Sequence, residues 1–455
     1  MSQIKMSEAV EIAMELVGKG VVIGEINNAR NLRWANSALT TNGDTVDQSL
    51  SIAAFVDTPD GIASGISSGQ FRNREDIAKL VEASKASAIA AGPAQDAMDL
   101  VTGPVHDNFH SEVIPPADEG IDFLSIQLGN VLPHGQFFGY AEQAQDTMLV
   151  ATSAGTRMRF SQSTSRFELC AKSEDRERSA WSGQSGTTLS DVMVTSHADT
   201  VLRGLEHQKN RIDQEPGLHK VTLSPSAMAD LMIYMLWSAT AREAHEGRSV
   251  FSNPLGGTRI GEQLTQRKLT IATDPALRGL ETVDHVVNLG SSSMSSSFDT
   301  GILTPRAEIL RDGTLNALGS SRHAALEAKL PFTPLSDNIE VRDAQGSGSI
   351  DELAARMGDG LLITCLWYIR EVDPQSLLLT GLTRDGVYVV KNGEIIGASN
   401  NFRFNESPVG MLSRISDAGD AVNCLPREWA DWFSRARVAP VTVDQFNLST
   451  RSDAV

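Results

Sequence analysis

One helix constrains the fold of this chain more than any other feature of its sequence. Ser224 can cap it, and Pro225 suits its first turn because proline has no backbone N–H to leave unsatisfied. Apolar residues then occupy nearly every face from Met228 to Leu236. A helix that is apolar all round is stable only where the rest of the protein encloses it. We therefore expect this helix to be central and buried.

The chain has 455 residues, which is enough for two or three domains. Its most linker-like stretch, Arg211–Leu218, combines charged residues with Pro and Gly, and we place a boundary there. We predict an N-terminal domain of residues 1–215 and a C-terminal domain of residues 219–455. The predicted class is α+β, with an α/β sandwich-like first domain and a β-rich, barrel-like second domain around the buried helix.

Pairs of turn-forming residues predict where strands reverse. Asp312-Gly313 and Asn392-Gly393 each separate two short β-prone segments, a pattern typical of two-residue hairpins. In the first half, Asn42-Gly43 and the TPDG stretch at 58–61 divide a small meander of extended segments. We expect a turn at each of these four places.

Polar residues that can accept hydrogen bonds from free backbone amides predict where other helices begin. Ser7 is expected to open a helix that ends near Gly18, and Asn73 one that ends near Gly92. Ser196 is expected to cap an amphipathic helix at the end of the first half. Ser349, with a glutamate three residues later, forms a capping-box pattern.

Charge and composition exclude several classes of protein. The chain carries 39 Lys and Arg against 57 Asp and Glu, a net charge of −18, which disfavours binding to nucleic acid. Its three cysteines lie far apart and predict neither a disulfide framework nor a zinc knuckle. No signal peptide is recognisable, and the longest apolar run, Leu231–Trp237, is far shorter than the roughly 20 residues of a membrane span. We expect a cytoplasmic protein.

Two short motifs could carry chemistry by themselves. His106 and His110 are four residues apart, which on a helix would bring both imidazoles to one metal ion. Ser67 lies in a G-x-S-x-G pattern, which requires a sharp strand-to-helix turn. Prolines around the histidines and the hairpin before Ser67 favour a polar loop and a strand edge instead. A self-sufficient peptidase that uses either motif remains an alternative.

A charged run follows the apolar helix. It includes Arg242, His245, Glu246 and Arg248, and no second histidine completes a zinc motif with His245. Such runs usually form solvated faces, so we interpret this one as the exposed end of the central helix. The alternative is that it lines a cleft.

Several separated segments together resemble the TldD/PmbA family, also called modulators of DNA gyrase. The resemblance covers nearly the whole chain and rests on the order and spacing of five segments: residues 32–43 (LRWANSALTTNG), 179–181 (SAW), 247–251 (GRSVF), 268–275 (KLTIATDP) and 386–394 (GVYVVKNGE).

The resemblance implies one of two kinds of subunit. The catalytic kind carries H-E-x-x-x-H on its central helix and a cysteine ligand near the C-terminus, whereas the PmbA/TldE-like kind lacks these ligands. Alignment on GRSVF places the histidines and glutamate of the motif near Trp237, Met232 and Ile233. Residues 228–237 contain neither His nor Glu. Cys424 remains, but a lone thiolate is not a zinc site, and it is expected to be a small buried side chain.

The family therefore implies that this chain has no catalytic residues and no cofactor of its own. Zinc is expected in a TldD-type metalloprotease partner, with which this PmbA/TldE-like subunit would form a heterodimer that encloses a groove for unfolded or extended peptides. Arg242, His245 and Arg248 are the residues we expect could line that groove. A second alternative is an acidic modulator of DNA gyrase that binds protein and not DNA.

Overall fold

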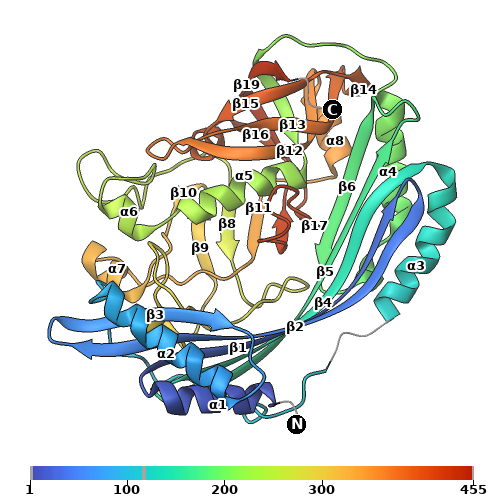
Figure 1. The fold of residues 1–455 in the computed structure, drawn as a ribbon. Coiled ribbons are helices and arrows are strands. Elements are labelled where there is room, and N and C mark those ends of the chain that lie inside the picture. Colours follow the sequence, from blue (N-terminus) through green and yellow to red (C-terminus); the bar gives the residue numbers. More distant parts are fainter. Residues whose placement is uncertain (1–3, 115–118, 453–455) are drawn as a thin grey trace.

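The predicted α+β class is confirmed by a computed structural model, which describes residues 4–114 and 119–452 (Figure 1). The first half of the chain builds one long antiparallel sheet with helices, and the second half builds a closed barrel, a further sheet and one buried helix between them. Within the described residues, no helix is both long and apolar enough to cross a membrane.

The long sheet has six antiparallel strands in the order β3-β2-β1-β4-β5-β6. Two hydrophobic clusters bind helices to it, one with α1 and α2 and the other with α3 and α4 at the opposite end (Figure 1). A third cluster, on another part of the sheet, packs against Phe298 from the second half; Phe298 stacks on Phe55 at 4.3 Å between ring centroids. The elements are β1 Gly20–Ala35, β2 Ala38–Thr58, β3 Gly61–Gly69, β4 Gln136–Thr152, β5 Arg157–Lys172, β6 Ser179–Gly186, α1 Met6–Val17, α2 Arg74–Ala91, α3 Glu119–Val131 and α4 Val194–His207.

One predicted turn of this sheet is wrong. The chain reverses between β1 and β2 at Asn36 and Ser37, whose φ angles of 51° and 60° suit a two-residue hairpin turn. Asn42 and Gly43 instead pair with Leu32 and Asn31 inside the ladder. The local preference of Asn-Gly for a turn is outweighed here because the continuous pairing of two long strands fixes the register. The TPDG turn between β2 and β3 is confirmed.

Of the helix caps predicted at Asn73, Ser349, Ser7 and Ser196, two are confirmed and two are wrong. Asn73 caps α2, and Ser349 forms a full capping box at the start of α8 (Ile350–Met357), as predicted. The caps predicted at Ser7 and Ser196 are wrong, because α1 and α4 begin upstream, at Met6 and Val194. Both of these residues are buried, so core packing sets the first turn without a side-chain cap.

The barrel closes from five strands in the order β12-β7-β19-β15-β13, with β13 pairing back onto β12. The two predicted hairpins are confirmed: one joins β9 to β10 through Asp312-Gly313, and the other joins β13 to β14 through Asn392-Gly393. The strands are β7 Gly217–Leu223, β12 Gly360–Asp373, β13 Leu378–Lys391, β15 Asn401–Glu406, β19 Val441–Ser452, β9 Ala307–Arg311, β10 Thr314–Leu315 and β14 Glu394–Ala398.

Helix α5 (Pro225–Ser238) lies between the barrel and a second six-stranded sheet, ordered β10-β9-β8-β11-β18-β17 (Figure 1). Ser224 caps it by accepting a hydrogen bond from the amide of Ala227 at 3.1 Å, and nearly all its side chains are buried, as predicted. The remaining elements are β8 Leu269–Thr273, β11 Ile339–Asp343, β16 Ile415–Ala418, β17 Val422–Cys424, β18 Ala436–Val438, α6 Ala241–His245, α7 Arg322–Ala328 and α9 Pro408–Leu412, with 3-10 turns at Leu132–His134, Leu189–Asp191 and Ser297–Asp299.

A buried polar cluster joins the two halves of the chain. The guanidinium of Arg427 binds the carboxylate of Asp385 on β13 and lies over the rings of Trp181 and Trp367. Ser179, at the start of β6, donates a hydrogen bond to the same carboxylate at 2.5 Å. Because a buried charge is stable only when it is paired, this contact fixes the orientation of β6 against the barrel.

Candidate functional site

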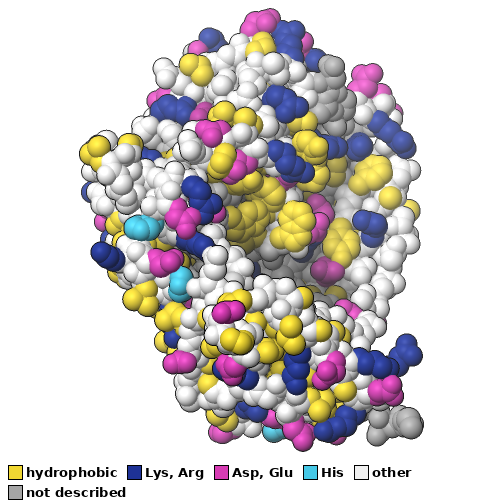
Figure 2. Space-filling view, turned by 60° about the vertical axis from the view of Figure 1, so that its left-hand side comes forward, with side chains coloured by type: hydrophobic (Ala, Val, Ile, Leu, Met, Phe, Trp, Pro, Cys, Tyr) yellow, Lys and Arg dark blue, Asp and Glu magenta, His cyan; other side chains and the backbone are white. Residues whose placement is uncertain are grey.

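Three neighbouring hollows form a groove on the second half of the chain, and the long sheet lines part of it. They measure about 490, 760 and 640 Å³, and we call them the first, second and third hollow. Trp237 lines both the first and the second hollow, and Phe433 lines both the first and the third. Figure 2 shows a hollowed face with hydrophobic side chains on its floor and charged ones around it.

Aromatic rings from two segments form the floor of this groove. They meet at steep angles: the ring centroids of Trp237 and Trp429 are 5.0 Å apart, and those of Tyr234 and Trp429 are 5.7 Å apart. Trp237 is 37% exposed and Trp432 74% exposed, so their rings are accessible to a ligand. We call this set the aromatic floor; its members are Tyr234, Trp237, Trp429, Trp432 and Phe433.

Helix α5 anchors the aromatic floor through Asp230. The backbone carbonyl of Asp230 accepts a hydrogen bond from the indole N–H of Trp429 at 2.8 Å, and its carboxyl accepts one from the amide of Glu428 at 3.2 Å. The carboxylate of Glu428 in turn accepts hydrogen bonds from the amides of Tyr368 and Ile369 on β12. The segment that carries Trp429 is therefore fixed to both the helix and the barrel.

Asp230 is an unusual residue for the centre of such a helix. It is fully buried, and its second carboxyl oxygen has no hydrogen-bond partner within the described part of the chain. Burial raises its pKa well above the ordinary value of 3.8, and the nearby Glu428 carboxylate raises this pKa further. Folding thus favours the neutral form of this carboxyl relative to the unfolded chain.

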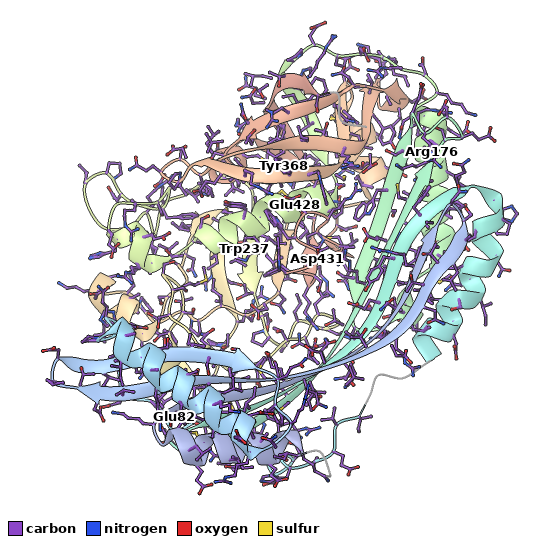
Figure 3. The ribbon with its side chains drawn as sticks, in the orientation of Figure 1. Glu82, Arg176, Trp237, Tyr368, Glu428 and Asp431 are labelled. Atoms are coloured by element: carbon purple, nitrogen blue, oxygen red, sulfur yellow. The ribbon has the colours of Figure 1, made fainter. Side chains whose placement is uncertain are left out.

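Charged groups lie along the groove beyond the aromatic floor. In the third hollow, Arg166 pairs with Glu168 at 3.1 Å and also with Asp431. In the second hollow, burial and the neighbouring Glu243 raise the pKa of Glu371. Figure 3 shows Trp237, Glu428 and Asp431 on the side of the second half that faces the long sheet.

The three positions that the family resemblance assigns to the metal motif have different surroundings. The side chains of Met232 and Ile233 are fully buried in the core around α5, whereas Trp237 opens into the groove. Zinc in proteins takes thiolate, imidazole and carboxylate ligands, and a thioether, an alkyl chain and an indole do not supply them. These residues therefore do not fit a zinc ion at that place. Within residues 4–114 and 119–452, no group of three or more His, Cys, Asp and Glu side chains could hold a metal ion.

We had expected the charged run after α5 to be the exposed end of that helix, and this prediction is wrong. The helix ends at Ser238 and a separate short helix, α6, follows, because the backbone at Ala239 leaves the helical conformation and Thr240 caps a new turn. Arg248 lines the second hollow, while Arg242 and His245 are not among the residues that line the three hollows. Arg242 instead contacts Gln95 and Glu246.

The remaining candidate residues lie outside the groove. His110 lies in a turn and His106 directly before it, so neither is on a helix, and the Nδ1 atom of His106 accepts a hydrogen bond from the amide of Arg159. Ser67 lies inside β3 and donates a hydrogen bond to the carbonyl of Leu80, so the nucleophile turn is missing. Cys424 is buried in the core, and burial raises the pKa of its thiol.

The aromatic segment near residue 430 is the part of the site that the sequence analysis missed. Trp429, Trp432 and Phe433 lie within five residues of one another in a chain that is only 5% aromatic. That local enrichment was the available signal. Without the fold, the sequence did not indicate that the segment would lie beside α5.

The fold and the groove define a class of two-part α+β proteins: a long antiparallel sheet forms the first part, and in the second a closed five-stranded barrel and a further sheet flank one buried helix. Residues 216–450 match the family described as PmbA/TldA metallopeptidase C-terminal domain. Since this match spans more than half of the chain, the protein belongs to the TldD/PmbA family. No curated protein matches it significantly.

Three solved structures share the fold at low sequence identity. A candidate modulator of DNA gyrase from Bacteroides thetaiotaomicron has a TM-score of 0.75 and 14% identity, over 97% of this chain and 98% of that one. TldE from Thermococcus kodakarensis has a TM-score of 0.74 and 12% identity, over 98% and 99%. A candidate gyrase modulator from Thermotoga maritima has a TM-score of 0.72 and 16% identity, over 97% and 100%.

Proposed function

We propose that this protein is a PmbA/TldE-like subunit of a TldD/TldE-type metallopeptidase complex. In this proposal it is not catalytic by itself, and a TldD-type partner subunit supplies the zinc site. The chain shapes and guards the groove through which an unfolded or extended peptide reaches that site.

One observation carries the proposal. The residues at the family's motif positions offer no zinc ligand, yet the last of them, Trp237, forms part of the aromatic floor of a groove that runs across three hollows. Aromatic surfaces give large contact areas with peptide side chains at low entropic cost. A subunit that holds a peptide and leaves hydrolysis to its partner would need this combination.

The test is reconstitution with the TldD-type protein of the same organism. We expect the two chains to co-purify and the complex to hydrolyse an unfolded polypeptide faster than the TldD-type protein alone. The variant Trp237→Ala should lower this rate about tenfold, because an aromatic anchor in a groove contributes on the order of 1–2 kcal/mol or more. Phe123→Ala is the matched control, since Phe123 is 41% exposed on α3 and does not line the three hollows.

Equal hydrolysis with and without this chain would contradict the proposal. Two other outcomes would favour the alternatives. Stoichiometric zinc in the isolated chain, lost when His106 and His110 are both replaced, would indicate a self-sufficient peptidase. Capture of DNA gyrase that survives high salt, with no effect on peptide hydrolysis, would indicate a gyrase modulator.

A further inference from the structure

The first hollow differs from the others in the charges that line it. Its charged or titratable lining residues are His285, Asp299 and Asp337, and among the residues that the structure describes no Lys or Arg lines it. The second and third hollows both contain arginines. A ligand group in the first hollow thus meets carboxylates without a balancing cation from the lining.

Two of these three side chains already have partners. Asp299 pairs with Arg322 at 2.7 Å, and the Nδ1 atom of His285 contacts Asp284 at 2.8 Å. For Asp337, the described part of the chain offers no side-chain hydrogen bond and no ion pair within 4 Å. Arg435 lowers the pKa of Asp337 through its charge, but its guanidinium is bound to the carbonyl of Ser163 and the hydroxyl of Thr164. The carboxylate of Asp337 is therefore free to bind a ligand.

The backbone around Asp337 is held in place by its neighbour. Asn338 is fully buried, and its side-chain amide donates hydrogen bonds to the carbonyls of Asp274 and Leu280 at 2.6 and 2.8 Å. Its side-chain oxygen accepts a hydrogen bond from the amide of Asp274. Asp337 is thus presented to the hollow from a fixed segment, which lowers the entropic cost of binding a ligand.

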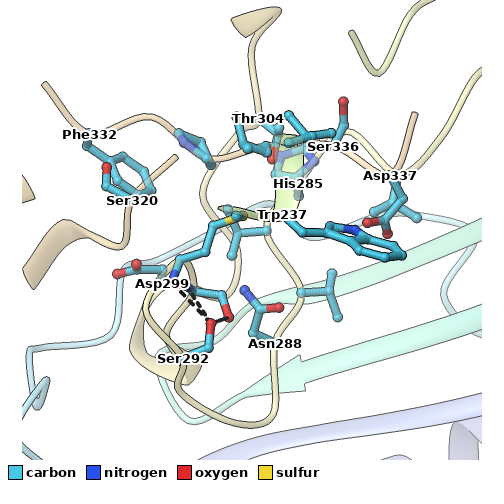
Figure 4. Close-up of a pocket in the computed structure, with 18 of the residues that line it drawn as sticks. Trp237, His285, Asn288, Ser292, Asp299, Thr304, Ser320, Phe332, Ser336 and Asp337 are labelled. Carbon is cyan, nitrogen blue, oxygen red and sulfur yellow. Dashed lines mark hydrogen bonds between the residues drawn. The ribbon is translucent and has the colours of Figure 1, made fainter. Parts of the chain in front are cut away.

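The indole of Trp237 lines the same hollow. Figure 4 draws the carboxyl of Asp337 above this indole in that view, with Asn288 and Ser336 also on the wall. An aromatic face attracts a cation electrostatically, and a carboxylate does so more strongly. Both groups line the first hollow, and because burial raises the pKa of Asp337, a neighbouring ammonium group would stabilise its charged form.

Other ligand groups fit this arrangement less well. An anion would meet the carboxylate of Asp337 with no basic residue in the lining to offset it. An apolar side chain would desolvate that carboxylate without replacing its hydrogen bonds, which is costly. A metal ion would find a single free carboxylate where it needs several ligands. A primary ammonium group satisfies both the carboxylate and the ring.

We propose that the first hollow is a subsite for a primary ammonium group of the bound peptide, held between the carboxylate of Asp337 and the indole of Trp237. The ammonium can come from a lysine side chain or from the free N-terminus of the peptide. This inference rests on the proposed function for its peptide ligand, and it adds the chemical class that the groove selects.

Binding of defined peptides to the full-length chain tests the subsite. The reference probe is a ten-residue peptide of Gly, Ser and Leu with one central Lys, acetylated at its N-terminus and amidated at its C-terminus. Acetyl-lysine or norleucine in place of that Lys removes the charge and keeps most of the side chain. A Lys-free peptide with a free N-terminus tests the second source of the ammonium group.

We expect at least one ammonium-bearing peptide to bind about tenfold more tightly than the probes without an ammonium group, and raised salt to reduce this preference. Asp337→Asn should abolish the preference, while Asp60→Asn, at an exposed turn of the long sheet, should leave it unchanged. Far-ultraviolet circular dichroism of each variant controls for folding, and the comparison among probes on the unaltered protein needs no variant.

Equal affinity for charged and uncharged probes, no measurable binding of any probe, or an unchanged preference in Asp337→Asn would overturn the subsite. These results are independent of the reconstitution experiment. If hydrolysis by the complex still depends on this chain, only the subsite is wrong. If the ammonium preference is present but the chain has no effect on hydrolysis, only the proposed function is wrong.

Discussion

The two parts of helix α5 show how one segment can serve both the core and the groove. Around Met232 and Ile233 the helix is enclosed by the barrel and the second sheet, and these side chains are fully buried. One turn later, Trp237 is 37% exposed and opens into two hollows. This difference shows that a helix with apolar residues on every face can still end at a surface that a ligand can reach. A single substitution should therefore affect stability at one part and peptide handling at the other.

The largest expected effect comes from a charge placed in the enclosed part. Ile233→Glu buries a carboxylate without a partner, and we expect it to lower the free energy of unfolding by more than about 4 kcal/mol, or to prevent folding. Urea denaturation followed by tryptophan fluorescence measures this loss. Ile233→Leu is the control and should cost less than about 1.5 kcal/mol. A stable Ile233→Glu protein would show that this part of the helix is not enclosed.

A truncation in the same part should have the next largest effect. Met232→Ala leaves a cavity in a close-packed region, so we expect a loss of about 2–5 kcal/mol in the free energy of unfolding. Met232→Leu keeps most of the volume and should cost less than about 1.5 kcal/mol. If both variants unfold at the same urea concentration as the unaltered protein, the packing around Met232 is looser than the structure indicates.

Asp230 should make the stability of the enclosed part of α5 depend on pH. Its pKa is raised in the folded state, so above about pH 4 the unfolded chain releases a proton that the folded chain retains, and stability falls as the pH rises toward the folded pKa. Asp230→Asn keeps the acceptor for the amide of Glu428 and removes the charge. We expect the free energy of unfolding of this variant to rise relative to that of the unaltered protein between pH 5 and pH 8, by about 1–3 kcal/mol at pH 8.

Urea denaturation of both proteins at the two pH values measures this gain. Asp60→Asn, at an exposed turn, controls for the general effect of removing one negative charge. A stability difference between Asp230→Asn and the unaltered protein that stays constant from pH 5 to pH 8 would mean that Asp230 is ionised in the folded protein.

The smallest effect on stability is expected at the groove. Trp237→Ala removes a partly exposed indole, so we expect a loss of no more than about 1–2 kcal/mol in the free energy of unfolding. The same variant should reduce peptide affinity about tenfold. Thermal denaturation and peptide titration of one preparation separate the two effects. A loss of stability as large as that of Met232→Ala would remove the distinction between the two parts of the helix.

Much of the local structure was predictable from sequence because short-range chemistry decides it. The Ser224 cap with Pro225, the capping box at Ser349 and the hairpins at Asp312-Gly313 and Asn392-Gly393 all formed as predicted. Each depends on residues only a few positions apart. The turn predicted at Asn42-Gly43 failed because pairing along the long β1 and β2 strands outweighed the local preference.

The candidate site was predicted only in part, because contacts between distant parts of the chain decide it. The sequence directed attention to Trp237, but it gave no reason to connect that residue with Trp429, Phe433 or Asp337. These residues are separated by about 100 or more positions from Trp237 along the chain. Only the hydrogen bonds from the 428–429 segment to Asp230 and the packing of the second sheet bring them together.

The sequence by itself determined that α5 would be buried, that two hairpins would form at Asp312-Gly313 and Asn392-Gly393, and that residues 228–237 would offer neither His nor Glu. Each of these follows from residue type and short spacing, which act within a few turns or one hairpin. The tertiary structure alone decided that the long sheet faces the aromatic floor, that the charged run after α5 becomes a separate helix and that Asp337 finds no side-chain partner among residues 4–114 and 119–452. These outcomes depend on how distant strands and loops pack together, and contacts across long sequence separations are not encoded in any local pattern.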